Sequence, residues 1–183
     1  MVTTGFFAGW TGLFAVGCGL FAQGLFAFLA ATYLTVDSEG EPELQNDFRR
    51  RALISGLLLA PAAALVFFLA RADARILFDR LTSWWSPWLL LATSVCAVGA
   101  LVMLGKRRFR TARMLAAGQV TLILLGWTFA QYPYLIVPDV SIFSAATSDS
   151  TLRLLTWILA AGAVVLFPSF AYLFAVFKKK NGP

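Results

Sequence analysis

The sequence predicts an all-α integral membrane protein, a helix bundle that crosses the membrane about five times. Of its 183 residues, 60% are hydrophobic and 13% are charged, and the mean hydropathy is +0.78. Soluble globular domains are roughly 45–50% apolar and about 25% charged. The charges are clustered, and the neutral apolar runs between them reach about 18 residues or more, the length of a helix that spans a bilayer. We therefore expect one membrane domain over residues 1–183.

The first predicted span covers residues 6–36, which carry no charge and are too long for the hydrophobic region of a signal peptide. Small residues recur within and just before it at steps of three and four: Gly5, Ala8, Gly12, Ala15, Gly19 and Ala22. This spacing places them on one helical face, where a neighbouring helix can approach closely. We expect this face to contact another helix, and leucine at Gly12 or Gly19 to weaken assembly.

The polar stretch DSEGEPELQNDFRRR (residues 37–51) precedes the second predicted span, residues 52–70. We interpret this stretch as a solvated loop in which Arg49, Arg50 and Arg51 contact lipid phosphates. Pairing of its charges with a partner subunit is the alternative. Pro61 lies near the middle of the span, and a kink is expected there because proline removes a backbone donor.

Residues 71–88, RADARILFDRLTSWWSPW, combine three arginines with apolar residues and three tryptophans. The pattern predicts a short interfacial helix and a tryptophan belt at the depth of the lipid headgroups. The third span covers residues 87–105, and the basic turn KRRFR (106–110) follows it.

The fourth span covers residues 111–131 and includes Gln119, a neutral polar residue expected to hydrogen-bond to another helix. The fifth covers residues 151–177, with Asp149 or Ser150 as its predicted N-cap. The run from Gly126 to Trp157 leaves the fourth span and enters the fifth; it is too apolar for an ordinary surface loop, so we interpret it as a docking and capping loop.

The basic residues predict the orientation of the chain. Eleven of the 15 Lys and Arg residues lie in the 36–51 loop, the 105–113 turn and the C-terminal tail, and four lie on the opposite side. The positive-inside rule places the C-terminus in the cytoplasm and the N-terminus outside. An uncharged external N-terminus and an odd number of spans are what the back part of a longer protein would show.

The residues supply no candidate catalytic, cofactor-binding or metal-binding site. The chain has no histidine, and its sulfur residues show no paired spacing: Met1, Cys18, Cys96, Met103 and Met114. Haem and zinc are usually held by His, Cys, Met, Tyr or carboxylates in defined sets. No ionisable residue lies deep inside a span, which argues against a proton pump or ion-coupled transporter. Nucleic-acid binding would need a soluble basic domain, which the sequence lacks.

Two stretches of the sequence carry a family resemblance. GWTFAQYPYLIVP (126–138), followed by a polar loop and TLRLLTW (151–157), resembles the C-terminal part of subunit II of cytochrome bd-type quinol oxidases. LFAFLAATYL (25–34), followed by FRRRA (48–52), resembles the middle of that subunit. The similarity spans essentially the whole chain in matching order. Subunit II normally has eight spans in two four-helix halves, so this chain resembles the last five.

The resemblance implies a complex of the prokaryotic cytoplasmic (inner) membrane that oxidises quinol and reduces dioxygen to water in aerobic respiratory electron transport. It implies that haems b and d and the quinol-oxidising loop belong to subunit I, and that this chain is a haem-free, non-catalytic partner in contact with membrane lipid and the quinone pool. A small polytopic transporter or exporter subunit is the alternative, although it would call for an intramembrane charge or matched broken helices. A structural membrane protein unrelated to respiration is a third.

Overall fold

The computed structural model describes residues 12–136 and 139–179, with side chains to residue 176. The chain divides into two compact units, residues 1–139 and 140–183. Within the described ranges, five helices are long and apolar enough to cross a membrane. This confirms the predicted all-α, multi-pass class.

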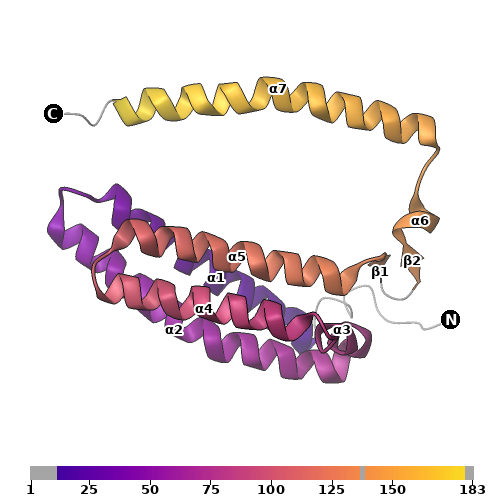
Figure 1. Ribbon diagram of the computed structural model, residues 1–183, viewed down its shortest axis with the longest axis horizontal. Helices are drawn as coiled ribbons and strands as arrows, with labels where there is room; N and C mark the ends of the chain where they lie inside the picture. The colour runs from indigo at the N-terminus through magenta and orange to yellow at the C-terminus, as the bar shows by residue number, and fades with distance from the viewer. Residues whose placement is uncertain (1–11, 137–138, 180–183) are drawn as a thin grey trace. The chain divides into compact units, whose positions relative to one another are not determined.

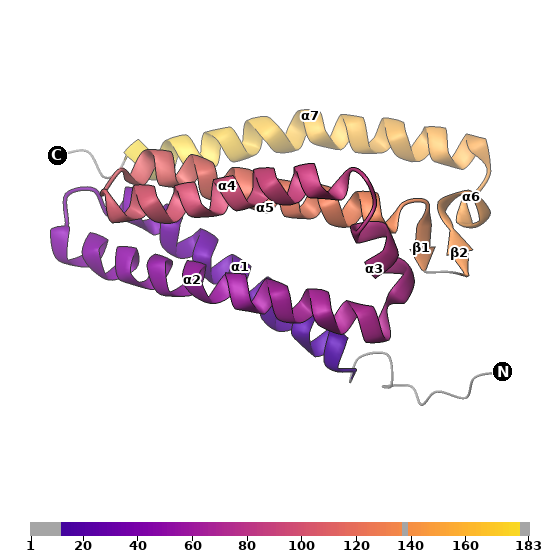
Figure 2. The same ribbon diagram turned by 60° about the horizontal axis from the view of Figure 1, so that its bottom comes forward.

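In the first unit, four long helices run up and down in sequence order (Figure 1): α1 (Leu13–Asp37), α2 (Pro42–Asp73), α4 (Ser86–Gly105) and α5 (Phe109–Gln131). The short helix α3 (Arg75–Leu81) connects α2 to α4 at one end (Figure 2), and the strand β1 (Tyr134–Ile136) follows α5. The main helix pairs are α1 with α2 and α4 with α5, and α1 also contacts α5. Short turns favour such antiparallel neighbours because they leave no length for a crossover.

The second unit contains the strand β2 (Val140–Ser141), the one-turn helix α6 (Ile142–Ala145) and the long helix α7 (Asp149–Lys179). A capping box starts α6: Ser141 Oγ accepts a hydrogen bond from the Ser144 amide, and Ser144 Oγ accepts one from the Ser141 amide, each at 3.0 Å. Asp149 is the first residue of α7 and Ser150 is the second, so neither residue is its N-cap. The prediction that one of them caps the helix is therefore wrong. The Asp149 carboxylate lies in the first turn instead, where it suits the positive end of the helix dipole.

Helix α2 begins at Pro42, ten residues before the second predicted span. The interpretation of the whole stretch from 37 to 51 as a loop is therefore wrong, because its last ten residues are helical. Apolar run length marks only the part of a helix that matches the hydrocarbon, and a helix can continue into the aqueous layer. Pro42 lies in the first turn, where a backbone N–H would have no intrahelical acceptor, so the helix loses no hydrogen bond to proline there.

The core of the first unit is built largely from small residues: Leu25, Phe28, Ala31, Ala52, Leu59, Ala100, Leu104, Ala112 and Ala116 are buried together. Alanine allows helix backbones to approach closely, which is how membrane helices gain van der Waals contact. Among the described glycines, Gly56 and Gly126 leave the least space for an added Cβ atom. A Cβ at Gly56 would lie 2.8 Å from Leu101 Cδ2, and a Cβ at Gly126 would lie 2.5 Å from Leu89 Cδ2.

Helix α1 packs on α2 through different glycines from those on the predicted face. No atom lies within 4 Å of a Cβ placed at Gly12 or Gly19, whereas Gly17 faces Leu69 of α2 at 3.2 Å and Gly24 faces Leu59 of α2 at 3.3 Å. Gly5 and Ala8, with residues 6–11 of the first predicted span, lie outside the described residues. Contact of the Gly12–Gly19 face with a further helix stays a prediction.

Candidate functional site

Of the sulfur residues, Met1 lies outside the described part of the chain, and the other four are spread over three helices. Cys18 on α1 and Cys96 on α4 are free and half-buried, and Cys96 Sγ would lie 3.7 Å from a Cβ at Gly118 of α5. Cys96 thus packs against α5 as a small apolar group. Met103 packs against the core, and Met114 is 75% exposed. In the part of the chain that the structure describes, no three His, Cys, Asp or Glu residues are grouped to hold a metal ion.

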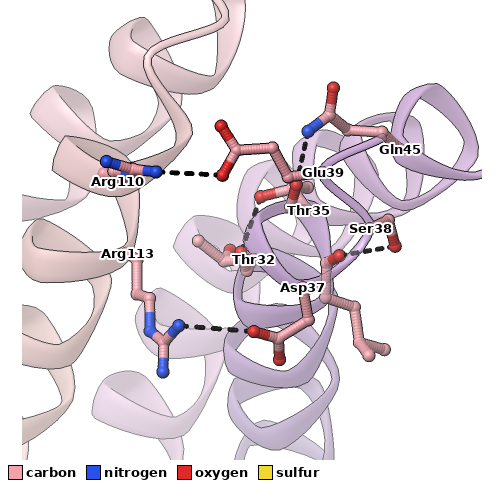
Figure 3. Close-up of polar contacts among 9 residues, drawn as sticks. Thr32, Thr35, Asp37, Ser38, Glu39, Gln45, Arg110 and Arg113 are labelled. Carbon is pink, nitrogen blue, oxygen red and sulfur yellow. Dashed lines mark hydrogen bonds and ion pairs between the residues drawn. The ribbon is translucent and has the colours of Figure 1, made fainter. Parts of the chain in front are cut away.

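Polar contacts gather instead at one end of the first unit, which we call the arginine end: Arg49 and the basic residues between 106 and 113. Arg113 of α5 is 3.6 Å from the carboxylate of Asp37, the last residue of α1 (Figure 3). Its guanidinium lies 4.0 Å from the centroid of the Tyr33 ring. An ion pair and a cation–π contact thus hold one guanidinium between two groups of α1. The combination fixes the end of α1 against the start of α5.

A second ion pair joins α5 to the turn between α1 and α2. Arg110 is 3.0 Å from the Glu39 carboxylate (Figure 3), and the two side chains are 81% and 66% exposed. Exposed pairs contribute about 0–1 kcal/mol, because water screens the charges and the long side chains lose freedom. The Arg113 side chain is 36% exposed, so water screens its ion pair with Asp37 less than it screens the pair of Arg110 with Glu39.

Arg49 caps helix α4. Its Nε donates to the Leu104 carbonyl oxygen at 2.7 Å, and its Nη2 donates to the Gly105 carbonyl oxygen at 3.0 Å. The last carbonyls of a helix lack intrahelical donors, and a cation there also suits the negative end of the dipole. Neighbouring Arg51 donates to Asp47 at 2.8 Å. Each of these two arginines thus has a partner within the chain, and contact of Arg49, Arg50 and Arg51 with lipid phosphates stays a prediction.

Buried hydroxyl groups at the arginine end are satisfied locally. Thr32 and Thr35 are fully buried and donate to the carbonyl oxygens of Phe28 and Thr32 at 2.8 and 2.7 Å. Gln45 at the start of α2 donates from Nε2 to the Thr35 carbonyl oxygen at 2.8 Å (Figure 3). The start of α2 is thus joined to the last turns of α1 by a side-chain hydrogen bond.

The opposite end, which we call the tryptophan end, contains α3 and Trp84, Trp85 and Trp88. Helix α3 agrees with the predicted short helix, and Trp84 and Trp88 are 83% and 73% exposed, as a belt facing lipid headgroups would be. The rings of Phe78 of α3 and Phe67 of α2 are in contact, with centroids 4.9 Å apart, and the ring centroid of Trp85, the N-cap of α4, lies 5.8 Å from that of Phe129 of α5. One aromatic contact therefore holds α3 to α2, and the other holds the start of α4 to α5.

Arg80 of α3 binds the segment after α5. Its Nη1 donates to the Tyr132 carbonyl oxygen, and its guanidinium lies 5.3 Å from the centroid of the Tyr134 ring. Gln131 Nε2 adds a bond to the Leu135 carbonyl oxygen at 3.1 Å. The first part of the 126–157 stretch is thus helix up to Gln131 and then a short segment anchored by α3. Sequence reasoning missed Arg80 because its partners lie about 50 residues away along the chain.

Gln119 is buried in α5, and its Oε1 has no hydrogen-bond partner among the described residues. The interhelical bond predicted for this side chain is therefore not made by its oxygen there. An unpaired buried amide oxygen costs roughly 1–3 kcal/mol.

A protein-family model described as cytochrome bd terminal oxidase subunit II matches residues 1–177, nearly the whole chain. No curated protein matches the sequence.

Proposed function

The chain belongs to the cytochrome bd terminal oxidase subunit II family, and from this premise we propose that it is the haem-free, non-catalytic subunit of a bd-type quinol oxidase. Membership makes it a multi-pass membrane subunit of an oxidoreductase complex. A transporter or exporter role is not favoured by this family. The proposal concerns the division of labour within the complex.

The ligand inventory of the chain carries the proposal. There is no histidine in the sequence, and Cys18 and Cys96 are separate half-buried thiols on different helices. Haem iron in proteins is held by His, Cys, Met or Tyr, and here the commonest of these is missing. These residues fit poorly as a haem site. We propose that haems b and d are held by the partner, subunit I, where quinol is oxidised and dioxygen is reduced to water.

The role left to this chain is structural. The helices of the first unit form a bundle braced at both ends, by Arg49 and Arg113 at one end and Arg80 at the other. Long, apolar, exposed faces suit packing against another membrane subunit or lipid. We propose that the chain acts as one membrane domain that packs against subunit I and stabilises its haem assembly, with no catalytic, cofactor-binding or metal-binding residue of its own.

The charge distribution supports an orientation in the prokaryotic cytoplasmic membrane. The turns that join α1 to α2 and α4 to α5 lie at the arginine end, and both are flanked by arginines. Three further arginines belong to the tryptophan end (Arg71, Arg75 and Arg80), where Asp73 and Asp79 accompany them. By the positive-inside rule we propose that the arginine end faces the cytoplasm. Cysteine labelling from outside intact cells tests this at Ser83 and Lys106 substituted by Cys.

Affinity purification from native membranes tests the assembly. A tag on this chain is expected to recover a haem-containing partner chain, with haem absorbance in the optical spectrum and quinol oxidase activity in the eluate. Recovery of the chain without haem, together with solute accumulation by vesicles that contain it, would overturn the oxidase role. The matched control is the same tag on an unrelated multi-pass protein of these membranes.

A further inference from the structure

A recess of about 320 Å³ lies at the arginine end, between the turn that joins α1 to α2 and the turn that joins α4 to α5. Val36, Glu39 and Gln45 line it from one side, and residues 107–111 line it from the other. Its walls are mainly polar side chains with two apolar residues, Val36 and Phe109. This composition fits a ligand with a charged group and an apolar part.

The charges in the recess are predominantly positive. Arg107, Arg108 and Arg110 line it, and Glu39 is the single carboxylate among its lining residues. Glu39 pairs with Arg110 at 3.0 Å. Neither Arg107 nor Arg108 has an ion-pair partner among the residues that the structure describes. The recess therefore presents two guanidinium groups that no carboxylate of the described residues pairs with.

Helix α5 adds to this positive potential. It begins at Phe109, no side chain caps it, and its first turn carries Arg110 and no acidic residue. Cations at the positive end of a helix dipole are unfavourably placed, and an anion there would relieve both the dipole and the arginines. The guanidinium fork and free amide groups are suited to phosphate oxygens.

The position of the recess indicates the source of the phosphate. Because α4 and α5 are both candidate membrane spans, the turn between them is at headgroup depth, where phospholipid phosphates are the abundant anions. Met114, four residues after Arg110 on α5, is 75% exposed and offers an apolar surface to an acyl chain. We propose that this recess binds the phosphate of an anionic phospholipid, with Arg107 and Arg108 as its principal contacts.

The test measures lipid retention by the purified complex. Native mass spectrometry with added short-chain phosphatidylglycerol, and with phosphatidylcholine as the zwitterionic comparison, reports the bound lipid. The pair Arg107→Asn and Arg108→Gln leaves the Glu39–Arg110 ion pair intact, and Asn tolerates the positive φ of 59° at residue 107. At about 1 kcal/mol for each basic residue near a membrane surface, this pair is expected to weaken phosphatidylglycerol binding roughly tenfold to thirtyfold.

Two further variants make the result specific. Arg71→Gln with Arg75→Gln removes the same charge from a recess of about 330 Å³ at the tryptophan end, which Asp79 also lines, and is expected to change retention less than threefold. Glu39→Gln removes the carboxylate from the first recess and is expected to tighten binding, which a loss of folding would not do. Excess inorganic phosphate is expected to leave the lipid bound.

Equal losses from the two arginine pairs would overturn the proposal, because they would show general attraction to basic residues. Unchanged retention by the Arg107 and Arg108 pair, or unchanged or weaker binding by Glu39→Gln, would also overturn it. Displacement of the lipid by inorganic phosphate would overturn the proposal that the ligand is a phospholipid, and would show that the recess binds free anions. None of these readings depends on where the haems of the complex lie.

Discussion

Arg80 in α3 donates a hydrogen bond to the main-chain carbonyl oxygen of Tyr132, 52 residues later in the sequence. The same guanidinium lies over the ring of Tyr134. A single side chain therefore connects the short helix at the tryptophan end with the segment that leaves α5. This relationship explains how a proline-containing segment without a helix of its own keeps a defined place on the bundle.

Replacing Arg80 with glutamine is expected to loosen residues 132–136, because the replacement removes the charged donor and the cation–π contact. The expected loss is about 1–2 kcal/mol, since a hydrogen bond from a charged group contributes about 1.5–3 kcal/mol and this one is partly exposed. Limited proteolysis of the complex in membranes measures the change as faster cleavage after Gln131. Arg75→Gln, on the same helix, is the control, and equal cleavage rates in the two variants would contradict the anchoring role.

Replacing Arg49 with glutamine is expected to destabilise the chain by about 1–3 kcal/mol, because the Leu104 and Gly105 carbonyl oxygens lose their charged donor. Thermal unfolding of the purified complex in detergent measures the effect as a lower midpoint. Arg50→Gln is the matched control, since Arg50 is an exposed neighbour whose side chain makes no hydrogen bond or ion pair with the residues that the structure describes. A midpoint that falls equally in both variants would show that the charge, and not the cap, matters.

Leucine at Gly56 and at Gly19 is expected to act at different stages. At Gly56 a Cβ would lie 2.8 Å from Leu101 and 2.9 Å from Phe28, so overpacking of about 1–3 kcal/mol is expected to lower the folded yield of the chain itself. At Gly19 the space is open, so the chain is expected to fold but to recover less of its partner. Membrane yield and co-purification measure the two effects. Normal partner recovery with Gly19→Leu would refute the packing role of that face.

Methionine at Gln119 is expected to leave stability unchanged or to raise it by about 1 kcal/mol, because the buried Oε1 has no partner in the described part of the chain. Methionine has a similar unbranched shape and avoids overpacking. The unfolding midpoint of the complex in detergent is the measurement. A fall equivalent to more than about 1 kcal/mol would mean that Gln119 makes a bond in the assembled complex.

The fold class follows from the sequence because apolar run length is a direct physical requirement for crossing a membrane. Helices α4, α5 and α7 begin one or two residues before their predicted spans, at Ser86, Phe109 and Asp149. The start of α2 was misplaced because hydropathy does not detect the part of a helix that lies in water. Pro42 followed by an acidic residue is nevertheless a recognisable first turn of a helix.

The polar contacts could be predicted only as clusters of charge. Arg49 and Leu104 are 55 residues apart, and Arg110 and Glu39 are 71 apart, so no local pattern pairs them. The packing face of α1 was also ambiguous. Glycine occurs on two sides of that helix, and only the position of Leu59 and Leu69 on α2 selects Gly17 and Gly24.

The haem content of this chain tests the central claim most directly. The chain is expressed in membranes with and without the partner subunit, purified through the same tag, and its haem is measured per chain by the reduced-minus-oxidised optical spectrum. The account predicts haem absorbance only when the partner co-purifies, and none from this chain alone. A stoichiometric haem signal from the folded chain without the partner would contradict it.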